Sequence, residues 1–457
     1  MVFEGVGCFS NIELNTFKKT MDKKLLLFKN MKKPYQDINS MCDERIPKGV
    51  RYEIANKLDY NELMNLCNVN KICSKLCSDD SYWAYRIYDK LGSIPNMAKK
   101  GKYREWYMKN VKNLYVLSEN SKEETIYRPR NRNRNLDIMS ENTMKLMENI
   151  SNMGDYTGIY KGDEGEENVY SMYVVDSFHN LKHIKGTLDN IYKKRNLLVD
   201  EIYIKNVNKF LGVVQIEKEQ EETDSFLFVY IDDSNTLIVY QLDTGVKMEI
   251  SKNVKNTKLY SIDGNGWFLY KLYYIVDDRL YIIKNLEDYI YEGKSSYKTD
   301  IYALDIAYIG DMQNEMINEE EMFENLVYVD LQGNVRHEDL ILAKNAKQIF
   351  EYINPNDDNE QKIAIYYIDN YDILFKLEYN GVEFKSPILV DYNVKNYYWN
   401  KYNLNEFILL KNGDLYFRNN ESDENSLQIL NNFKLLSTNV DQVYPETFET
   451  IFFSKII

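Results

Sequence analysis

Three cysteines that stand close together, Cys67, Cys73 and Cys77, are the first residues whose type and spacing could do chemistry. Zinc sites usually combine closely spaced cysteine pairs with further Cys or His ligands. The pair at 73 and 77 would fit that spacing on one helical face, and Cys67 could be a third ligand, but the sequence offers no obvious fourth. Free cysteine is also a common small buried residue. We therefore predict buried thiols, no metal ion and no cofactor.

Two histidines, His179 and His183, stand four residues apart in "HNLKH" and would share one face of a helix. A zinc protease needs a Glu beside the first histidine as general base, and that position holds Asn180. The surrounding sequence is strand-like, so we predict a pair of surface histidines. The sequence also lacks a phosphate-binding loop, a nucleophile elbow and a dinucleotide fingerprint. We therefore predict that the protein is not an enzyme.

Four arginines occupy alternate positions in "YRPRNRNRN" at 127–135. On an extended strand they would lie on one side and could bind an acidic peptide or RNA. A loop between strands is the simpler interpretation, because the formal net charge of the whole chain is −14. The same charge argues against a dedicated nucleic-acid binder. The residues of this possible acidic-partner loop are Arg128, Arg130, Arg132 and Arg134.

The size and composition of the chain predict more than one folded unit. The chain has 457 residues, more than one ordinary core holds, and 44% of them are apolar. No apolar run is long enough to span a membrane, and we see no signal-peptide pattern. Five cysteines, with none after Cys77, do not make a disulfide framework. We therefore expect an intracellular protein, in the cytoplasm or nucleus.

The first 110 residues divide into three segments. Residues 1–44 are a lysine-rich leader without a sustained apolar period, so we expect a mobile arm, with a short amphipathic attachment helix as the alternative. Residues 45–92 place apolar side chains three and four apart, which predicts a small helical module. Within it, Pro47 suits a first helical turn, and Asp59 suits an N-cap. Residues 93–110 are predicted to be a helical linker.

From residue 111 to the end the apolar period changes to two, and short strands alternate with turns rich in Asp, Asn and Gly. No long helix separates these strands, so we expect them to be antiparallel. One short sequence motif, which we call the recurring phrase, reads Val-Lys-Asn-Leu-Tyr in its first copy and returns in varied form at intervals of about 47 residues or twice that. This repeat predicts a β-propeller of about seven blades over residues 111–457. The copies of the phrase begin at Val111, Val199, Val254, Ala346, Val394 and Val440. We expect residues 440–457 to pair with the first blade and close the ring.

Residues 46–83 begin with Ile46-Pro47, continue with Glu62-Leu63 and Val69-Asn70-Lys71, and end at Tyr82-Trp83. These residues, in this order, resemble an F-box. That family begins with Leu-Pro, continues with apolar positions on a first helix, then Asp/Glu-Leu and Val-x-Lys, and ends near Asp and Leu-Trp. The resemblance implies binding to a Skp-type adaptor and, through it, to a cullin ubiquitin ligase; the alternative is that these residues pack only within the chain. The adaptor-binding positions carried over from the resemblance are Ile46, Pro47, Val50, Ile54, Leu58, Leu63, Leu66, Val69, Leu76 and Trp83.

The repeat units are similar to blades of the regulator-of-chromosome-condensation propeller family, most clearly in "VKNYYWNKYNLNEFILLKNGDLYFRN". A small α-helical F-box followed by an antiparallel all-β propeller is an α+β multidomain architecture that looks like proteins of large DNA viruses. The resemblance implies a substrate-recognition subunit of a Skp–cullin–F-box ubiquitin ligase, whose propeller binds a target protein that the sequence does not identify. The alternative is a non-enzymatic propeller scaffold with a helical cap and no link to ubiquitin.

Overall fold

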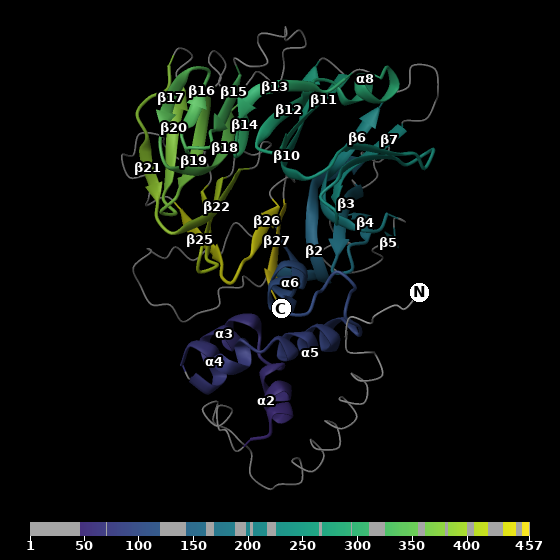
Figure 1. The fold of residues 1–457 in the computed structure, drawn as a ribbon, viewed down its shortest axis with the longest axis vertical. Helices are drawn as coiled ribbons and strands as arrows, with labels where there is room; N and C mark the ends of the chain where they lie inside the picture. Colours follow the sequence, from purple (N-terminus) through teal and green to yellow (C-terminus); the bar gives the residue numbers. More distant parts are fainter. Residues whose placement is uncertain are drawn as a thin grey trace, which may run out of the picture. The chain divides into compact units, whose positions relative to one another are not determined.

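The chain separates into two compact units, one around the helices of residues 46–113 and one around the strands that follow. The arginines at 128–134 and the leader 1–44 lie outside the described residues. The computed structural model describes residues 46–69, 71–118, 143–160, 169–187, 198–201, 204–216, 225–264, 267–293, 295–309, 325–354, 362–379, 383–399, 406–418, 433–444 and 450–456 (Figure 1).

The first unit is helical. Its described helices are α2 (Lys48–Ala55), α3 (Tyr60–Val69), α4 (Lys71–Cys77), α5 (Asp80–Leu91) and α6 (Tyr103–Asn110). A reciprocal capping box begins α3: the Glu62 amide donates to the Asp59 carboxylate (2.8 Å) and the Asp59 amide donates to the Glu62 carboxylate (3.0 Å). Asp79 caps α5, and Gly92 ends it at a φ of 76°. The expected N-cap at Asp59 is confirmed, whereas Pro47 lies at the N-cap position of α2, one residue before its first turn.

The core of this unit is aromatic and surrounds one buried cation. Tyr82, Trp83 and Tyr107 are buried at its centre. Arg86, which is fully buried, donates to the carbonyls of Ala55 (3.1 Å) and Leu58 (2.9 Å) and to the Tyr107 hydroxyl (3.0 Å). Because Ala55 ends α2 and Leu58 follows it, this guanidinium fixes the end of α2 and the segment after it to α5.

The second unit is an antiparallel β-propeller (Figure 1). Five of its sheets have four strands, paired in chain order. Two of them are β6 (Val207–Ile216), β7 (Ser225–Asp232), β8 (Leu237–Gln241) and β9 (Lys247–Ser251), and β10 (Val254–Gly264), β11 (Trp267–Val276), β12 (Arg279–Ile283) and β13 (Tyr297–Tyr302). The short helix α8 (Leu286–Tyr291) connects β12 to β13.

Three further sheets repeat this plan. They are β14 (Asp305–Tyr308), β15 (Leu326–Val329), β16 (Val335–His337) and β17 (Leu340–Ala343); β18 (Ala346–Asn354), β19 (Lys362–Asp369), β20 (Leu374–Tyr379) and β21 (Ile388–Asp391); and β22 (Val394–Trp399), β23 (Glu406–Leu410), β24 (Leu415–Arg418) and β25 (Lys434–Ser437). Figure 1 shows the first strands, such as β10 and β18, nearer the middle of the propeller than the last strands, such as β17 and β21.

The sixth sheet joins the two ends of the propeller. Its strands are β1 (Lys112–Ser118), β2 (Thr143–Tyr160), β3 (Val169–Asp176), β4 (Leu181–Thr187), β5 (Leu198–Glu201), β26 (Gln442–Tyr444) and β27 (Thr450–Ile456). Their order is β26-β27-β1-β2-β3-β4-β5, so the last two strands pair with the strands that open the propeller. The expected closure by the C-terminal segment is confirmed, with two strands instead of one.

The propeller has six blades, and the expectation of about seven was wrong. The phrase at Val199 lies in β5, the last strand of its sheet, and the next sheet begins at Val207. The phrases at Val111 and Val440 belong to one and the same sheet, in which β26 and β1 both lie. The interval from Val111 to Val199 is about twice the usual one and would correspond to two units, but it contains strands of one sheet only, so the repeat length overestimated the number of blades.

The blades are connected by one recurring backbone bond. In each of six junctions, an amide at the start of a blade donates to the carbonyl of a left-handed residue in the second turn of the blade before it, at 2.8–2.9 Å. The pairs, donor first, are Val207 and His179, Val254 and Asn235, Ala303 and Asp278, Ala346 and Gly333, Val394 and Asp372, and Val440 and Gly413. Six junctions return the chain to its first sheet, so the ring is closed.

Gly413 gives a test of these junctions. Its φ is +86°, and an added Cβ would lie 3.0 Å from the Cα of Asn439 in the next link. Gly245 has a similar φ of +69° but meets only the end of the Tyr240 side chain at 3.8 Å, which makes Gly245→Ala the matched control. We expect the left-handed backbone conformation to destabilise both alanine variants. Gly413→Ala should lose about 1–3 kcal/mol more in the free energy of unfolding, because the backbone atoms of Asn439 cannot move aside. Urea unfolding of the two variants measures this difference; equal losses would contradict it.

Candidate interaction surfaces

The residues expected to bind an adaptor differ in how far they remain accessible. Six of them, Ile46, Val50, Leu63, Leu66, Leu76 and Trp83, are buried. Ile54 and Leu58 are half-buried and Pro47 is exposed, whereas the side chain of Val69 lies outside the described residues. The accessible part of the expected surface is therefore formed by Pro47, Ile54 and Leu58.

A small apolar cluster lies beside the main core of the helical unit, and Leu58 packs against both. Leu66 and Cys73 are buried in it, and Ile54, Leu58 and Ile72 pack against them while half-buried. The cluster draws its members from α2, the segment after α2, α3 and α4. Three of its five members thus keep some of their surface in contact with solvent, so the cluster could bury more area against a partner.

The start of α2 is fixed by charge. The Lys48 ammonium lies 2.6 Å from the Asp79 carboxylate, and the Tyr52 hydroxyl donates to the same carboxylate at 2.6 Å. Burial opposes ionisation of Asp79, but the bonds from Lys48 and Tyr52 outweigh it and lower the pKa of Asp79. Pro47 and the first turn of α2 are therefore held against the start of α5.

The cysteines differ from the expectation of free thiols. Cys67, Cys73 and Cys77 are all buried, but the structure joins Cys67 to Cys77 by a disulfide. The reason is the packing of α3 against α4, which places the two Cα atoms 6.1 Å apart, within the range that a disulfide spans. Sequence spacing alone carried no signal for this pairing. Among the described residues, no group of three or more His, Cys, Asp or Glu side chains is arranged to hold a metal ion.

The two histidines do not form the expected surface pair. His179 is buried in a turn at a φ of 61°, and its Nδ1 atom contacts the Asp233 carboxylate. His183 lies on β4 and stacks on Tyr173 at 4.7 Å between ring centroids. The carbonyl of His179 also accepts the hydrogen bond of one of the six blade junctions.

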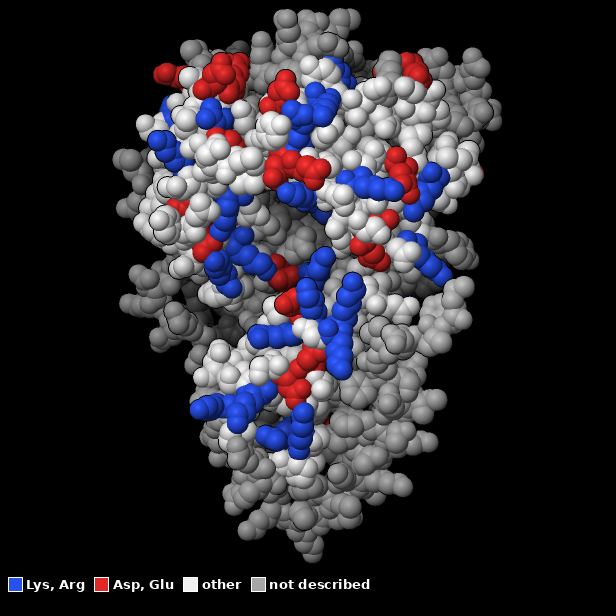
Figure 2. Space-filling view, viewed as in Figure 1, with Lys and Arg blue, Asp and Glu red and all other residues white. Residues whose placement is uncertain are grey.

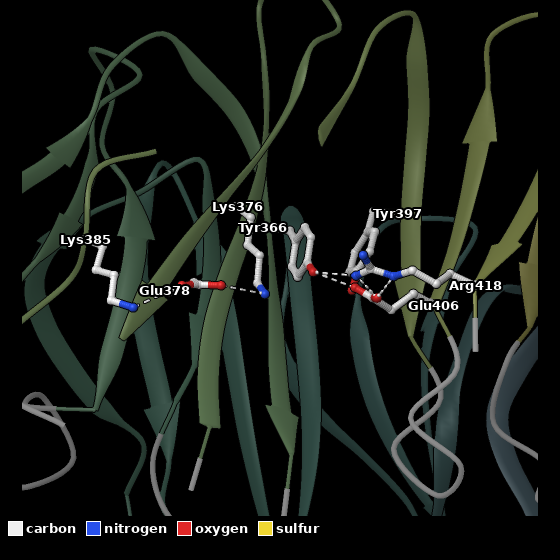
Figure 3. A network of polar contacts seen from close by, with 7 residues as sticks. All are labelled: Tyr366, Lys376, Glu378, Lys385, Tyr397, Glu406 and Arg418. Atoms are coloured by element: carbon white, nitrogen blue, oxygen red, sulfur yellow. Dashed lines mark hydrogen bonds and ion pairs between the residues drawn. The ribbon is translucent and has the colours of Figure 1, made fainter. Parts of the chain in front are cut away.

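A buried polar network connects the last two four-stranded sheets (Figure 3). Glu406 at the start of β23 is fully buried, and its carboxylate accepts hydrogen bonds from Tyr366 (2.5 Å) and Tyr397 (2.8 Å). Arg418 at the end of β24 pairs with the same carboxylate, its Nε atom at 2.6 Å. The two phenol rings stack at 4.1 Å. One carboxylate therefore joins residues of both sheets.

The electrostatics of this network favour a structural role. Burial, followed by the nearby Glu406 charge, raises the pKa values of Tyr366 and Tyr397 well above their ordinary value, so both phenols stay protonated. Burial opposes the charge on Arg418, but Glu406 more than compensates for it and raises the Arg418 pKa. A neutralised ion pair with two neutral phenols offers no group poised to exchange a proton near neutral pH.

Exposed apolar residues gather on one face of the propeller, which we call the linker face. It consists of the second turn of each blade, which in a four-stranded sheet joins the second and third strands, and of the links, the short segments that connect one blade to the next. The six junctions hold these turns and links together. No pattern in the sequence predicted the exposure of these side chains, although Tyr392 stands two residues before the recurring phrase that begins at Val394. Eleven large apolar residues are exposed among the described residues, and five of them lie on this face: Tyr302, Leu304, Leu331, Tyr371 and Tyr392.

Basic and acidic side chains also alternate on this face. Lys255 pairs with Asp278 at 2.6 Å, Lys395 pairs with Asp441 at 2.7 Å, and Asp372 contacts both Lys347 and Lys411. Figure 2 shows one face of the molecule, on which blue and red side chains lie next to one another in small groups.

None of the described helices is long and apolar enough to cross a membrane.

Comparisons with known proteins show no family for this chain. No protein-family model matches it, and no curated protein matches it. Among solved structures, it is similar to AofleA from Arthrobotrys oligospora (10% identity, 67% of this chain and 90% of that chain, TM-score 0.34) and to BBS1N in complex with ARL6DN (10%, 68% and 94%, 0.38). It is also similar to the Cps50 (Swd1) β-propeller domain of Myceliophteria thermophila (8%, 66% and 96%, 0.34). At such identities and TM-scores, nothing about function follows, and the propeller is assigned from its own sheets.

Proposed function

We propose that this chain is a non-enzymatic interaction protein in which the helical unit docks on a Skp-type adaptor and the propeller holds a target protein for a cullin ubiquitin ligase. The observation that carries the docking step is the partly covered cluster of Ile54, Leu58 and Ile72 around Leu66 and Cys73. It lies on the helices in which the F-box resemblance places the adaptor contacts.

The anchored start of α2 supports the same proposal. Pro47 is exposed, and the Lys48–Asp79 and Tyr52–Asp79 bonds hold the turn next to it in one position. A contact that is fixed before binding loses less conformational entropy on association. Pro47 and Ile54 would then form the accessible centre of the docking surface, while buried residues such as Leu63 shape it from within.

The adaptor proposal predicts the loss of binding without the loss of the fold. Pro47→Ala combined with Ile54→Asp places a charge in the proposed contact, which costs several kcal/mol once water is excluded. We expect the full-length variant to recover at least about tenfold less purified Skp-type adaptor in a co-purification experiment. A charge at Leu63 is unsuitable, because Leu63 is fully buried in the core of the unit.

The matched control is Lys100→Asp, which places the same charge at an exposed position of the helical unit outside the proposed surface. It should leave adaptor recovery unchanged. Circular dichroism and thermal melting of all three proteins check that the fold is retained. Unchanged adaptor recovery from a folded Pro47→Ala, Ile54→Asp variant would exclude the docking proposal and leave a propeller scaffold without a ubiquitin link.

A further inference from the structure

One patch of the linker face combines exposed aromatic side chains with lysines. Tyr371, at the tip of the turn between β19 and β20, is 75% exposed, and Tyr392, in the link between β21 and β22, is 51% exposed. We call the tyrosine–lysine patch the set formed by Lys344, Lys347, Tyr371, Asp372, Tyr392 and Lys411. Large apolar residues exposed singly need no explanation, but neighbouring ones with rigid positions mark a candidate binding surface.

Backbone bonds show that the members of this patch are neighbours. The Asn370 amide donates to the Asn345 carbonyl (2.8 Å), the Val394 amide to the Asp372 carbonyl (2.8 Å), and the Lys411 amide to the Asn393 carbonyl (2.9 Å). These bonds join the turn with Tyr371, the link with Lys344, the link with Tyr392 and the turn with Lys411. The patch therefore spans three consecutive blades on a preorganised backbone, which favours binding.

The accessible charge of the patch is basic although acids lie beneath it. Asp372 contacts two ammonium groups, those of Lys347 and Lys411, and its side chain is 19% exposed whereas that of Lys411 is 55% exposed. Lys344 is exposed and makes no ion pair with the described residues. These three lysines against one carboxylate leave an excess of positive charge at the surface.

The other acids near the patch are engaged with the backbone or with their own cations. Asp369 is buried and accepts from the Tyr371 and Ile373 amides (2.9 and 2.8 Å). Asp391, also buried, accepts from the Tyr392 amide (2.6 Å), and Asp414 accepts from the Asn412 side chain (2.8 Å). Asp441 pairs with Lys395 beside the patch. These carboxylates hold the turns in shape, so an approaching ligand meets tyrosine rings and ammonium groups first.

We propose that the tyrosine–lysine patch binds an acidic protein segment that carries an aromatic or aliphatic side chain. The carboxylates of the segment would accept hydrogen bonds from the ammonium groups of the lysines, and its apolar side chain would pack against Tyr371 and Tyr392. A short acidic segment fits this patch better than nucleic acid, because three lysines around one carboxylate can pair with a few carboxylates but do not form the extended basic field that a phosphate backbone needs. This inference deepens the proposed function, since it names the class of target segment that the propeller would hold.

Fluorescence anisotropy with the full-length protein tests the patch. The probe is a labelled synthetic peptide in which Glu alternates with Leu and Tyr, compared with the same peptide carrying Gln for Glu. We expect the acidic peptide to bind, the Gln peptide to bind at least about tenfold more weakly, and Tyr371→Ala with Tyr392→Ala to weaken the acidic peptide by a similar factor. Lys344→Glu with Lys347→Glu should also weaken it and reduce its salt dependence.

Two control variants match these substitutions by residue type. Tyr297→Ala removes a tyrosine that is 46% exposed on β13, and Lys298→Glu reverses an exposed charge on the same outer strand. Both positions pair with β12 away from its turn to β11, so they lie off the linker face. The proposal would be overturned if the control substitutions weakened peptide binding as much as the patch substitutions do. It would also be overturned if the acidic and Gln peptides bound equally well. Tighter binding of a labelled oligothymidylate than of the acidic peptide would also overturn the proposal and would indicate a nucleic-acid site.

The same proteins separate this inference from the adaptor proposal. The patch variants should recover the Skp-type adaptor normally, and the Pro47→Ala, Ile54→Asp variant should bind the acidic peptide normally. Normal adaptor recovery together with no peptide binding by the unmodified protein would overturn the patch alone. Peptide binding that depends on Tyr371 and Tyr392, without any adaptor recovery, would support the patch and exclude the ubiquitin link.

Discussion

A chain that ends at Asn439 is expected to lose its folded propeller, although all five four-stranded sheets remain in it. The deletion removes β26 and β27 from the sheet that also contains β1 and β2, so β1 becomes an open edge. It also removes the Val440 amide that donates to the Gly413 carbonyl in the sixth junction. Open strand edges are templates for association, and a ring gains stability from closure.

The core would be opened by the same deletion. Val440, Val443 and Phe453 are buried against residues of β23 and β24, and Phe453 stacks on Tyr115 of β1 at 5.6 Å. Burying one large apolar side chain contributes about 1.5–3 kcal/mol, so losing three of them together approaches the whole stability of an ordinary domain.

Thermal melting and light scattering of the 1–439 protein measure this effect. We expect aggregation, or a melting temperature lower by well over ten degrees, because about 1 kcal/mol corresponds to a few degrees. A synthetic peptide of residues 440–457, added before refolding, should partly restore the soluble folded protein, and a peptide with Phe453→Asp should not. Equal melting temperatures of the 1–439 and full-length proteins would show that the C-terminal strands do not close the ring.

The sequence predicted the propeller because its signals were local. The alternation of apolar residues and the Asp, Asn and Gly turns act within one hairpin: Asp232, for example, accepts from the amides of Ser234 and Thr236 in its own turn. The number of blades depends instead on which strand of a sheet each phrase occupies. Val199 carries the phrase but lies in a last strand, whereas Val207 begins a blade and departs from the phrase beyond its first residues. The pairing of strands that are distant in the chain decides the number of blades, and a single sequence carries no direct signal for that pairing.

The candidate surfaces were predictable only in part for the same reason. The F-box resemblance identified Leu63 and Trp83 as adaptor-binding positions, but it did not separate residues that pack inside the unit from residues that stay accessible. Burial of Arg86 beneath α2, which no pattern signalled, decides how α2 and α5 pack. Tyr371 and Tyr392 were missed because exposure in a turn has no period, and their proximity arises from backbone bonds between blades.

Arg418→Met is expected to destabilise the propeller strongly, because it leaves the Glu406 carboxylate buried without a cation. Glu406 is fully buried, and after the substitution only the hydroxyls of Tyr366 and Tyr397 would remain to stabilise its charge. Removing one partner of a buried ion pair typically costs about 3–5 kcal/mol. The matched control is Lys385→Met, which breaks the 3.2 Å pair with Glu378 at a lysine that is 57% exposed (Figure 3). That exposed pair should contribute about 0–1 kcal/mol.

Removing the buried charge as well should relieve this loss. In Arg418→Met with Glu406→Gln no buried carboxylate is left without a cation, so we expect the double variant to recover part of the stability that Arg418→Met loses. Urea unfolding of the single and double variants and of Lys385→Met measures these effects. Equal losses in Arg418→Met and Lys385→Met would show that the Glu406–Arg418 pair does not hold the two sheets together.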